Sequence, residues 1–209
     1  GFFVSVCGIP PFISTLGMMT LLRGVILVYT KGSPIPIKSD AYKFFGKGSI
    51  AGIPVPVIIL IIVFLLAHYI LTQTSYGRSV YAVGGNREAA RLSGIRVKTS
   101  EFLVYTLNGL MCGMAGLILT ARLGSAQSTS GTGIEMDAIA AVILGGTSLS
   151  GGVGFVLPTV VGAMIMGIID NILTLMNVNP HATNIVKGAV ILIAVLVDKK
   201  VKDLSAKAE

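Results

Sequence analysis

The chain of 209 residues contains no tryptophan, little charge, and only two cysteines and two histidines. Charged residues make up 12% of the sequence, and Cys7, Cys112, His68 and His181 are scattered along it. Because none of them has a partner at ligand spacing, we expect no metal ion, no cofactor and no His-based catalytic pair. The two cysteines lie in apolar surroundings, so we interpret them as buried small hydrophobes.

The chain is instead rich in apolar residues and glycine. Hydrophobic residues account for 53% of it, glycine occurs 26 times, and the mean hydropathy is +0.85. These values lie far outside those of a soluble domain and predict an all-α fold, a polytopic transmembrane helical bundle surrounded by lipid. The net charge of +7 does not indicate a nucleic-acid partner, because basic residues in short loops beside apolar spans are typical of membrane orientation.

Six apolar segments are predicted to be helical, and a span of about 20 residues suffices to cross a bilayer. They cover residues 12–30, 54–72, 102–121, 137–144, 155–176 and 185–197. Arg23 lies inside the first, where a charge is costly, so it either snorkels to an interface, pairs inside the protein or lies along a transport route. In the third, Gly109 and Gly113 predict close packing against another helix. Residues 31–52 are predicted to form an extramembrane loop, and Asp170 an interfacial or helix-end contact.

Residues 138–169 form an uncharged run that is too long for one perpendicular membrane span and too short for two. The excess falls where glycines gather around Thr147, Ser148 and Ser150. Irregular backbone at membrane depth survives only when it is buried in protein or lines a wet cavity. Together with Asp137, these three hydroxyl residues are therefore candidates for the lining of a translocation path. The alternative is that the glycines only permit helix packing.

The polar stretch of residues 76–98 is ordered like a short, well-terminated helix outside the membrane. Asn86 can cap it, Glu88 lies in its first turn and Arg91 in its last, as the helix dipole favours. Gly94 can adopt the left-handed conformation that ends it. The pattern predicts a helix of about 12 Å.

The same stretch has the character of a docking surface. Ala89 and Ala90 leave one flank low enough for the backbone of another protein to approach, and Arg87 and Arg91 share a face. The stretch also holds Arg78, Arg96 and Lys98, and the C-terminal tail is basic through Lys199, Lys200, Lys202 and Lys207.

This distribution of charge places both the 76–98 stretch and the tail in the cytoplasm. An even number of crossings must then separate them, so segment 138–154 has to cross, whereas a re-entrant hairpin would put the tail outside. By the same parity the 31–52 loop lies outside, although its four lysines argue against that.

Several separated phrases resemble the membrane permease subunits of bacterial ABC importers for monosaccharides, above all the ribose-type permeases. They are residues 10–17 (Pro-Pro-Phe-Ile-Ser-Thr-Leu-Gly), 23–24 (Arg-Gly), 77–86 (Gly-Arg-Ser-Val-Tyr-Ala-Val-Gly-Gly-Asn), 89–95 (Ala-Ala-Arg-Leu-Ser-Gly-Ile) and 138–148 (Ala-Ile-Ala-Ala-Val-Ile-Leu-Gly-Gly-Thr-Ser). The resemblance implies a permease of the bacterial cytoplasmic membrane that works as a homodimer. It also implies two ABC ATPase subunits and an extracytoplasmic sugar-binding protein as partners.

In such permeases the cytoplasmic loop containing Glu-Ala-Ala supplies a coupling helix that sits in a groove of the ATPase. Glu88-Ala89-Ala90 falls on that position. The resemblance thus makes residues 76–98 the coupling loop, with its contacts from Arg78, Asn86, Arg87, Glu88, Ala89, Ala90, Arg91 and Gly94. The chain lacks a Gly-x-x-x-x-Gly-Lys-Ser/Thr loop, so ATP hydrolysis is assigned to the partner and the chain is not itself an enzyme.

Members of this family usually carry further spans at the N-terminus. Residues 1–209 are therefore either a single permease domain or the C-terminal part of a longer permease. The expected function is passage of a ribose-like monosaccharide. The alternatives are a permease for another small solute, such as a nucleoside or branched-chain amino acid, and a passive channel or membrane scaffold.

Overall fold

The computed structural model describes residues 1–205, apart from the side chains of residues 180, 181 and 197–205. Lys207 of the basic tail lies outside the described residues, as do the side chains of the other three tail lysines.

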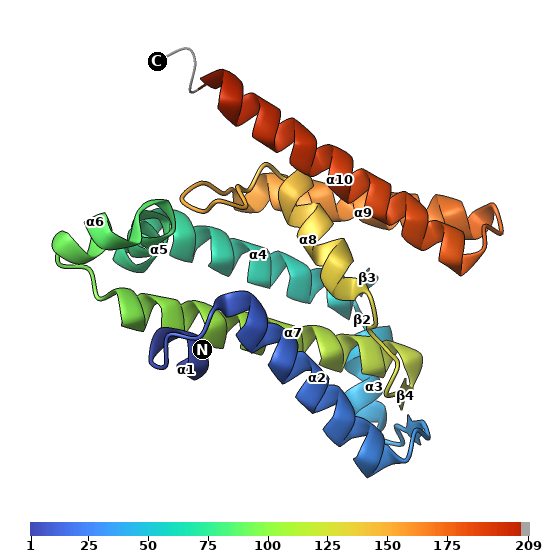
Figure 1. Ribbon diagram of the computed structural model, residues 1–209. Coiled ribbons are helices and arrows are strands. Elements are labelled where there is room, and N and C mark those ends of the chain that lie inside the picture. Colours follow the sequence, from blue (N-terminus) through green and yellow to red (C-terminus); the bar gives the residue numbers. More distant parts are fainter. Residues whose placement is uncertain (206–209) are drawn as a thin grey trace. The chain divides into compact units, whose positions relative to one another are not determined.

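The described chain is mostly helical (Figure 1), which confirms the all-α prediction. Its helices are α1 (Phe2–Ser5), α2 (Pro11–Thr30), α3 (Asp40–Lys47), α4 (Val55–Gln73), α5 (Ser75–Gly85), α6 (Arg87–Leu92), α7 (Val97–Leu123), α8 (Ile134–Leu144), α9 (Val156–Leu175) and α10 (Pro180–Ser205). Its strands are β1 (Ile35–Pro36), β2 (Ser49–Ile50), β3 (Ile53–Pro54) and β4 (Ser125–Ala126).

Among the described residues, four helices (α2, α4, α7 and α9) are long and apolar enough to cross a membrane, and Ala182–Leu196 of α10 is a shorter apolar stretch. The chain is a multi-pass membrane protein. The predicted spans agree with α2, α4 and α9, whereas α7 and α10 extend beyond their predicted bounds of 102–121 and 185–197. Helix α10 continues to Ser205, into the predicted tail. Helix α7 has 27 residues, or about 40 Å, because Lys98, Glu101 and Arg122 continue its terminal turns instead of belonging to loops.

The helix ends follow from local chemistry. Pro11 opens α2, at a position where a missing N–H costs nothing. Gly124 ends α7 with a positive φ of 75°, and its N–H donates to the Thr120 carbonyl at 2.9 Å.

The chain divides into two units, the first of residues 1–83 and 87–131 and the second of residues 84–86 and 132–209. In the first, β1 pairs antiparallel with β4, with Ile35 opposite Ala126 and Pro36 opposite Ser125. The C-terminal ends of α2 and α7 are therefore tied at one end. Helix α4 runs away from this tied end and α7 runs back to it. Helices α5 and α6, which connect them, therefore lie at the opposite end of α4 and α7 (Figure 1).

Residues 31–52 are not the plain loop that we predicted, because they contain α3. Ser39 caps this helix by accepting a hydrogen bond from the Tyr42 N–H at 3.4 Å, and Asp40 and Lys47 occupy its first and last turns. Tyr42 also bonds Thr120 of α7 through the two hydroxyls at 2.8 Å. Ser39 as a cap, an acid in the first turn and a base in the last turn are sequence signals of a helix. The prediction missed them because the segment is rich in Gly, Pro and Lys, which favour a loop.

In the second unit α8 and α9 form a hairpin whose backbones touch. A Cβ added to Gly162 would collide with the carbonyl oxygen of Ala141, so only glycine allows this approach. Ala140, Ala141 and Met166 form a small core there, against which Ile169, Val190 and Ile191 pack. The predicted short helix, glycine-rich break and full helix are confirmed by α8, the segment 145–155 and α9.

Two packing predictions differ from the structure. A Cβ on Gly109 or Gly113 would meet nothing within 4 Å, so within the described chain this glycine face of α7 is open. Cys7 and Cys112 are both exposed, not buried. In a membrane protein an apolar neighbourhood in the sequence marks the lipid-facing surface as readily as the interior, and this explains why the burial prediction was wrong.

Candidate functional site

The predicted coupling helix is present as α6, six residues between α5 and α7 and about 9 Å long. Glu88 lies in its first turn and Arg91 in its last. Its end has both bonds of a Schellman motif: the Gly94 N–H donates to the Arg91 carbonyl and the Ile95 N–H to the Ala90 carbonyl, each at 3.1 Å. Gly94 has a φ of 84°, which confirms the conformation expected for it.

The polar stretch contains more helix than the sequence indicated. Residues 75–85 form α5, so Asn86 separates two helices and does not follow a loop. Arg78 lies on α5 and donates to the Ser75 hydroxyl at 2.9 Å. The candidate docking surface is therefore a helix–break–helix unit.

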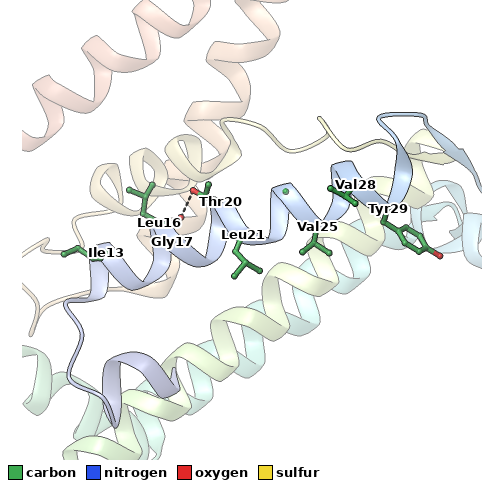
Figure 2. A pocket seen from close by; sticks show the side chains of 9 residues that line it. Ile13, Leu16, Gly17, Thr20, Leu21, Val25, Val28 and Tyr29 are labelled. Carbon is green, nitrogen blue, oxygen red and sulfur yellow. Dashed lines mark hydrogen bonds between the residues drawn. The ribbon is translucent and has the colours of Figure 1, made fainter.

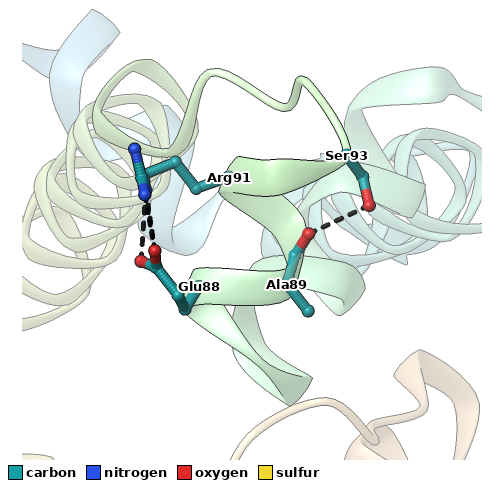
Figure 3. A network of polar contacts seen from close by, with 4 residues as sticks. All are labelled: Glu88, Ala89, Arg91 and Ser93. Carbon is teal, nitrogen blue, oxygen red and sulfur yellow. Dashed lines mark hydrogen bonds and ion pairs between the residues drawn. The ribbon is translucent and has the colours of Figure 1, made fainter.

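The charges of α6 are paired within the chain. Arg91 contacts Glu88 at 2.6 Å (Figure 3), while Arg87 binds Glu101 of α7 at 2.8 Å. The hydrogen bond from Arg91, followed by the nearby charge of Arg87, lowers the pKa of the Glu88 carboxyl. Because Glu88 and Arg91 are both exposed, the pair contributes little stability. Its effect is to hold an ordered pair of charges at the surface.

The two alanines of α6 lie in different environments. Ala90 is buried, with 4% of its surface exposed, whereas Ala89 is exposed, and its carbonyl accepts a bond from the Ser93 hydroxyl (Figure 3). The expectation that both form one low flank is therefore wrong for Ala90. In a helix this short, consecutive side chains point about 100° apart, so one alanine turns inward.

The glycine-rich segment between α8 and α9 is irregular and internally bonded. Gly146, Gly151 and Gly152 have positive φ values of 75°, 87° and 78°. The Ser148 N–H donates to the Val153 carbonyl at 2.9 Å, and its hydroxyl accepts the Ser150 N–H at 3.1 Å. Thr147 and Ser148 are half-buried, whereas Ser150 is exposed.

This segment meets the chain immediately before α6. Residues 84–86 belong to the second unit, and there a Cβ on Gly84 would lie 2.8 Å from the Gly152 nitrogen. A Cβ on Gly151 would collide with the Gly84 carbonyl oxygen, while one on Gly85 would make an ordinary contact of 3.8 Å. Two backbones touch here without side chains between them.

Asp137, the fourth predicted path residue, lies in a charged cluster on α8, α9 and α10. The Lys187 ammonium donates to Asp137 Oδ2 at 2.8 Å and lies 2.9 Å from Asp170 Oδ1. Sequence reasoning missed Lys187 by including it in the apolar helix 185–197, and it separated Asp170 from Asp137. A lysine inside an apolar segment was the available signal, because such a charge requires a partner.

Arg23 is exposed on α2. A hollow runs along another face of this helix (Figure 2), lined by Ile13, Leu16, Gly17, Thr20, Leu21, Gly24, Val25, Val28 and Tyr29. Its Thr20 hydroxyl already donates to the Leu16 carbonyl at 2.9 Å. The hollow is thus an apolar packing face with few polar groups, and Arg23 is not part of it.

Among the described residues, no three His, Cys, Asp or Glu side chains gather in a way that could hold a metal ion. What the described residues offer is a short, charged, exposed helix and, in the second unit, a closely packed hairpin of α8 and α9.

Comparison with known proteins identifies the family. The family described as a branched-chain amino acid transport system / permease component matches residues 1–195. The chain belongs to this permease family. It is 52% identical over 204 residues to the ribose import permease protein RbsC of Escherichia coli (strain K12), covering 96% of this chain and 64% of that protein. Against RbsC of Bacillus subtilis (strain 168), identity is 50% over 91% of this chain and 60% of the relative.

A further relative is the D-allose transport system permease protein AlsC of Escherichia coli (strain K12), 40% identical over 95% of this chain and 61% of that protein. The chain thus spans less than two thirds of the length of these relatives. No solved structure matches it.

Proposed function

We propose that the chain is the permease part of an ATP-driven ABC importer that moves a monosaccharide, ribose or a similar sugar, across the bacterial cytoplasmic membrane. The observation that carries the proposal is the identity of about half the residues to ribose import permeases of two bacteria. A relative named for D-allose supports sugars as the class. The family description, which refers to branched-chain amino acids, keeps a different small solute as the second candidate.

In this proposal α6 is the coupling helix and the 76–98 stretch is cytoplasmic. Arg78, Asn86, Arg87, Glu88, Ala89 and Arg91 contribute the docking surface for an ABC ATPase, while Ala90 and Gly94 shape the helix from behind. Support comes from the exposed Glu88–Arg91 pair and from the closed Schellman end, which hold a small element in one conformation. ATP hydrolysis belongs to the partner, and this chain converts the partner's movement into opening of the path.

The complete assembly is proposed to contain two permease copies, two ATPases and an extracytoplasmic sugar-binding protein. The 31–52 segment then lies outside and the C-terminal tail inside. The approach of Gly151 and Gly152 to Gly84 and Gly85 supports a segment 145–155 that reaches the cytoplasmic side. It completes the crossing that the 11 residues of α8, about 16 Å, leave unfinished.

The path itself is proposed to be lined by Asp137, Thr147, Ser148 and Ser150, with Arg23 as a further candidate. An uncharged sugar suits hydroxyl and backbone contacts of moderate strength, because a tight charged site would hold it. Ser148→Cys is the test, read by a water-soluble maleimide in resting and ATP-driven states. Labelling that changes between states supports the path, and no labelling in either state favours pure helix packing.

The coupling assignment is tested by bulk at the exposed alanine, using the importer reconstituted with its ATPase and binding protein. Ala89→Phe should abolish sugar uptake and weaken co-purification of the ATPase while leaving the permease folded, because it obstructs only the exposed flank. Thr99→Phe, at an exposed position in the first turn of α7, is a control for added surface bulk. Normal uptake by the Ala89 variant would contradict the assignment. Absence of any ATPase partner would favour the passive channel.

A further inference from the structure

The charged cluster of the second unit is unbalanced: it joins one cation to two anions on three helices. Lys187 of α10 lies between Asp137 of α8 and Asp170 of α9, at 2.8 Å and 2.9 Å. The three side chains are 17%, 24% and 38% exposed, in a part of the chain made of apolar helices. The cluster therefore carries one negative charge more than its lysine compensates.

The lysine meets the two carboxylates at almost the same distance. Its ammonium lies 2.8 Å from Oδ2 of Asp137, to which it donates a hydrogen bond, and 2.9 Å from Oδ1 of Asp170, with which it forms an ion pair. Oδ1 of Asp137 is buried and has no hydrogen-bond partner among the described residues. One ammonium is thus shared by two carboxylates, and it can favour either without losing its own ion pair.

The packing around the cluster separates a fixed pair of helices from a third. The hairpin of α8 and α9 is closed by backbone contact at Gly162 and Ala141, and movement there would have to open a glycine contact. Helix α10 joins the hairpin through side chains: the lysine and the small apolar core with Val190 and Ile191. A shared cation lets α10 shift along the hairpin by exchanging one carboxylate for the other.

We propose that Lys187 is a positioning residue for transport, holding α10 to the α8–α9 hairpin through a cation shared between Asp137 and Asp170. The inference rests on the proposed sugar import. Sharing, and not pairing alone, is the functional property. If the lysine needed only one ion-pair partner, a single carboxylate would be enough. Removal of the second would then stabilise the protein, because it lowers the free-energy cost of keeping a net charge among apolar helices.

This difference gives the test. In the reconstituted importer, Asp170→Asn and Asp137→Asn each leave one neutral lysine–aspartate pair. We expect both permeases to reach the membrane at wild-type level and to melt at or above the wild-type temperature. ATP-driven uptake of labelled ribose should nevertheless fall by about tenfold. Asp40→Asn, which removes an exposed acid outside the spans, is the matched control and should leave both measurements unchanged.

Wild-type uptake by both single variants would overturn the proposal and reduce the cluster to a structural contact. If a single variant does not accumulate, the uncharged triple variant Asp137→Asn, Asp170→Asn and Lys187→Met removes every charge of the cluster, and the proposal then expects a wild-type amount of permease in the membrane with reduced uptake. Wild-type uptake by the triple variant would also overturn the proposal. If the wild-type importer itself carries no ribose, the proposed function fails instead, and the variants are then compared with the solute that the wild type does carry.

Discussion

At the scale of single residues, the surface of α6 is organised by one exposed ion pair. The hydrogen bond of Arg91 lowers the pKa of Glu88, so the carboxylate stays charged to lower pH than an isolated glutamate. A group with a lowered pKa in the folded state contributes stability above its ordinary pKa and loses it as the pH falls through the lowered value. Acid should therefore loosen the order of this pair, while neutral and alkaline conditions keep it.

The first prediction concerns Arg91. Arg91→Met should raise the pKa of Glu88 towards its ordinary value, because the largest cause of the shift is removed, whereas Arg87→Met should raise it less. Carboxyl NMR titration of selectively labelled permease in micelles measures both. Equal shifts from the two substitutions would contradict the pairing described for α6.

At the scale of elements, the glycine contact between residues 84–85 and 151–152 offers a graded experiment. A methyl group at Gly84 would lie 2.8 Å from the Gly152 backbone, and one at Gly85 would lie 3.8 Å from it. Both glycines are helical in α5 and neither has a positive φ, so helix propensity affects the two substitutions equally.

We therefore expect Gly84→Ala to lower the melting temperature, by an overpacking cost of about 1–3 kcal/mol, and to reduce ATP-driven uptake. Gly85→Ala should resemble the wild type. Melting in detergent and uptake in vesicles are the two readouts. Should both alanine variants behave alike, the close approach of the two backbones does not matter to the working protein.

At the scale of the whole molecule, the β1–β4 ladder gives a prediction of sidedness. The ladder ties the ends of α2 and α7, and α6 lies at the other end of α4 and α7. Cysteines placed at the exposed Ser33 and Ser93 should react with a membrane-impermeant reagent from opposite sides, Ser33→Cys in intact cells and Ser93→Cys only in opened ones. Labelling of both from one side would refute this topology.

Much of this architecture could be predicted from the sequence, because length and hydropathy alone decide which segments can cross a bilayer. The bounds of α2, α4 and α9 and the φ of Gly94 followed from such local rules. The remaining features are tertiary. No local pattern shows that Ala90 turns inward while Ala89 does not, or that Gly162 and not Gly109 carries the close helix contact.

The candidate site divides in the same way. The order of charges in residues 86–94 indicated a short helix. By contrast, Asp137 and Asp170, the two acids that contact Lys187, are 33 residues apart in the sequence and lie on different helices. Only packing brings them together. A lysine in an apolar run signals that some partner exists, and the fold decides which one.

The two exposed thiols, Cys7 beside α1 and Cys112 within α7, determine how labelling chemistry on this protein can be read. The cysteine sulfur is the nucleophile that attacks a maleimide, and polar maleimides stay in the water phase. Cys112 should therefore react slowly with polar maleimides and faster with small membrane-soluble ones. Its labelling rate then reports how deep this part of α7 lies in the membrane. Any engineered cysteine needs a background in which both are replaced by serine or alanine, and the wild-type protein supplies the reference signal.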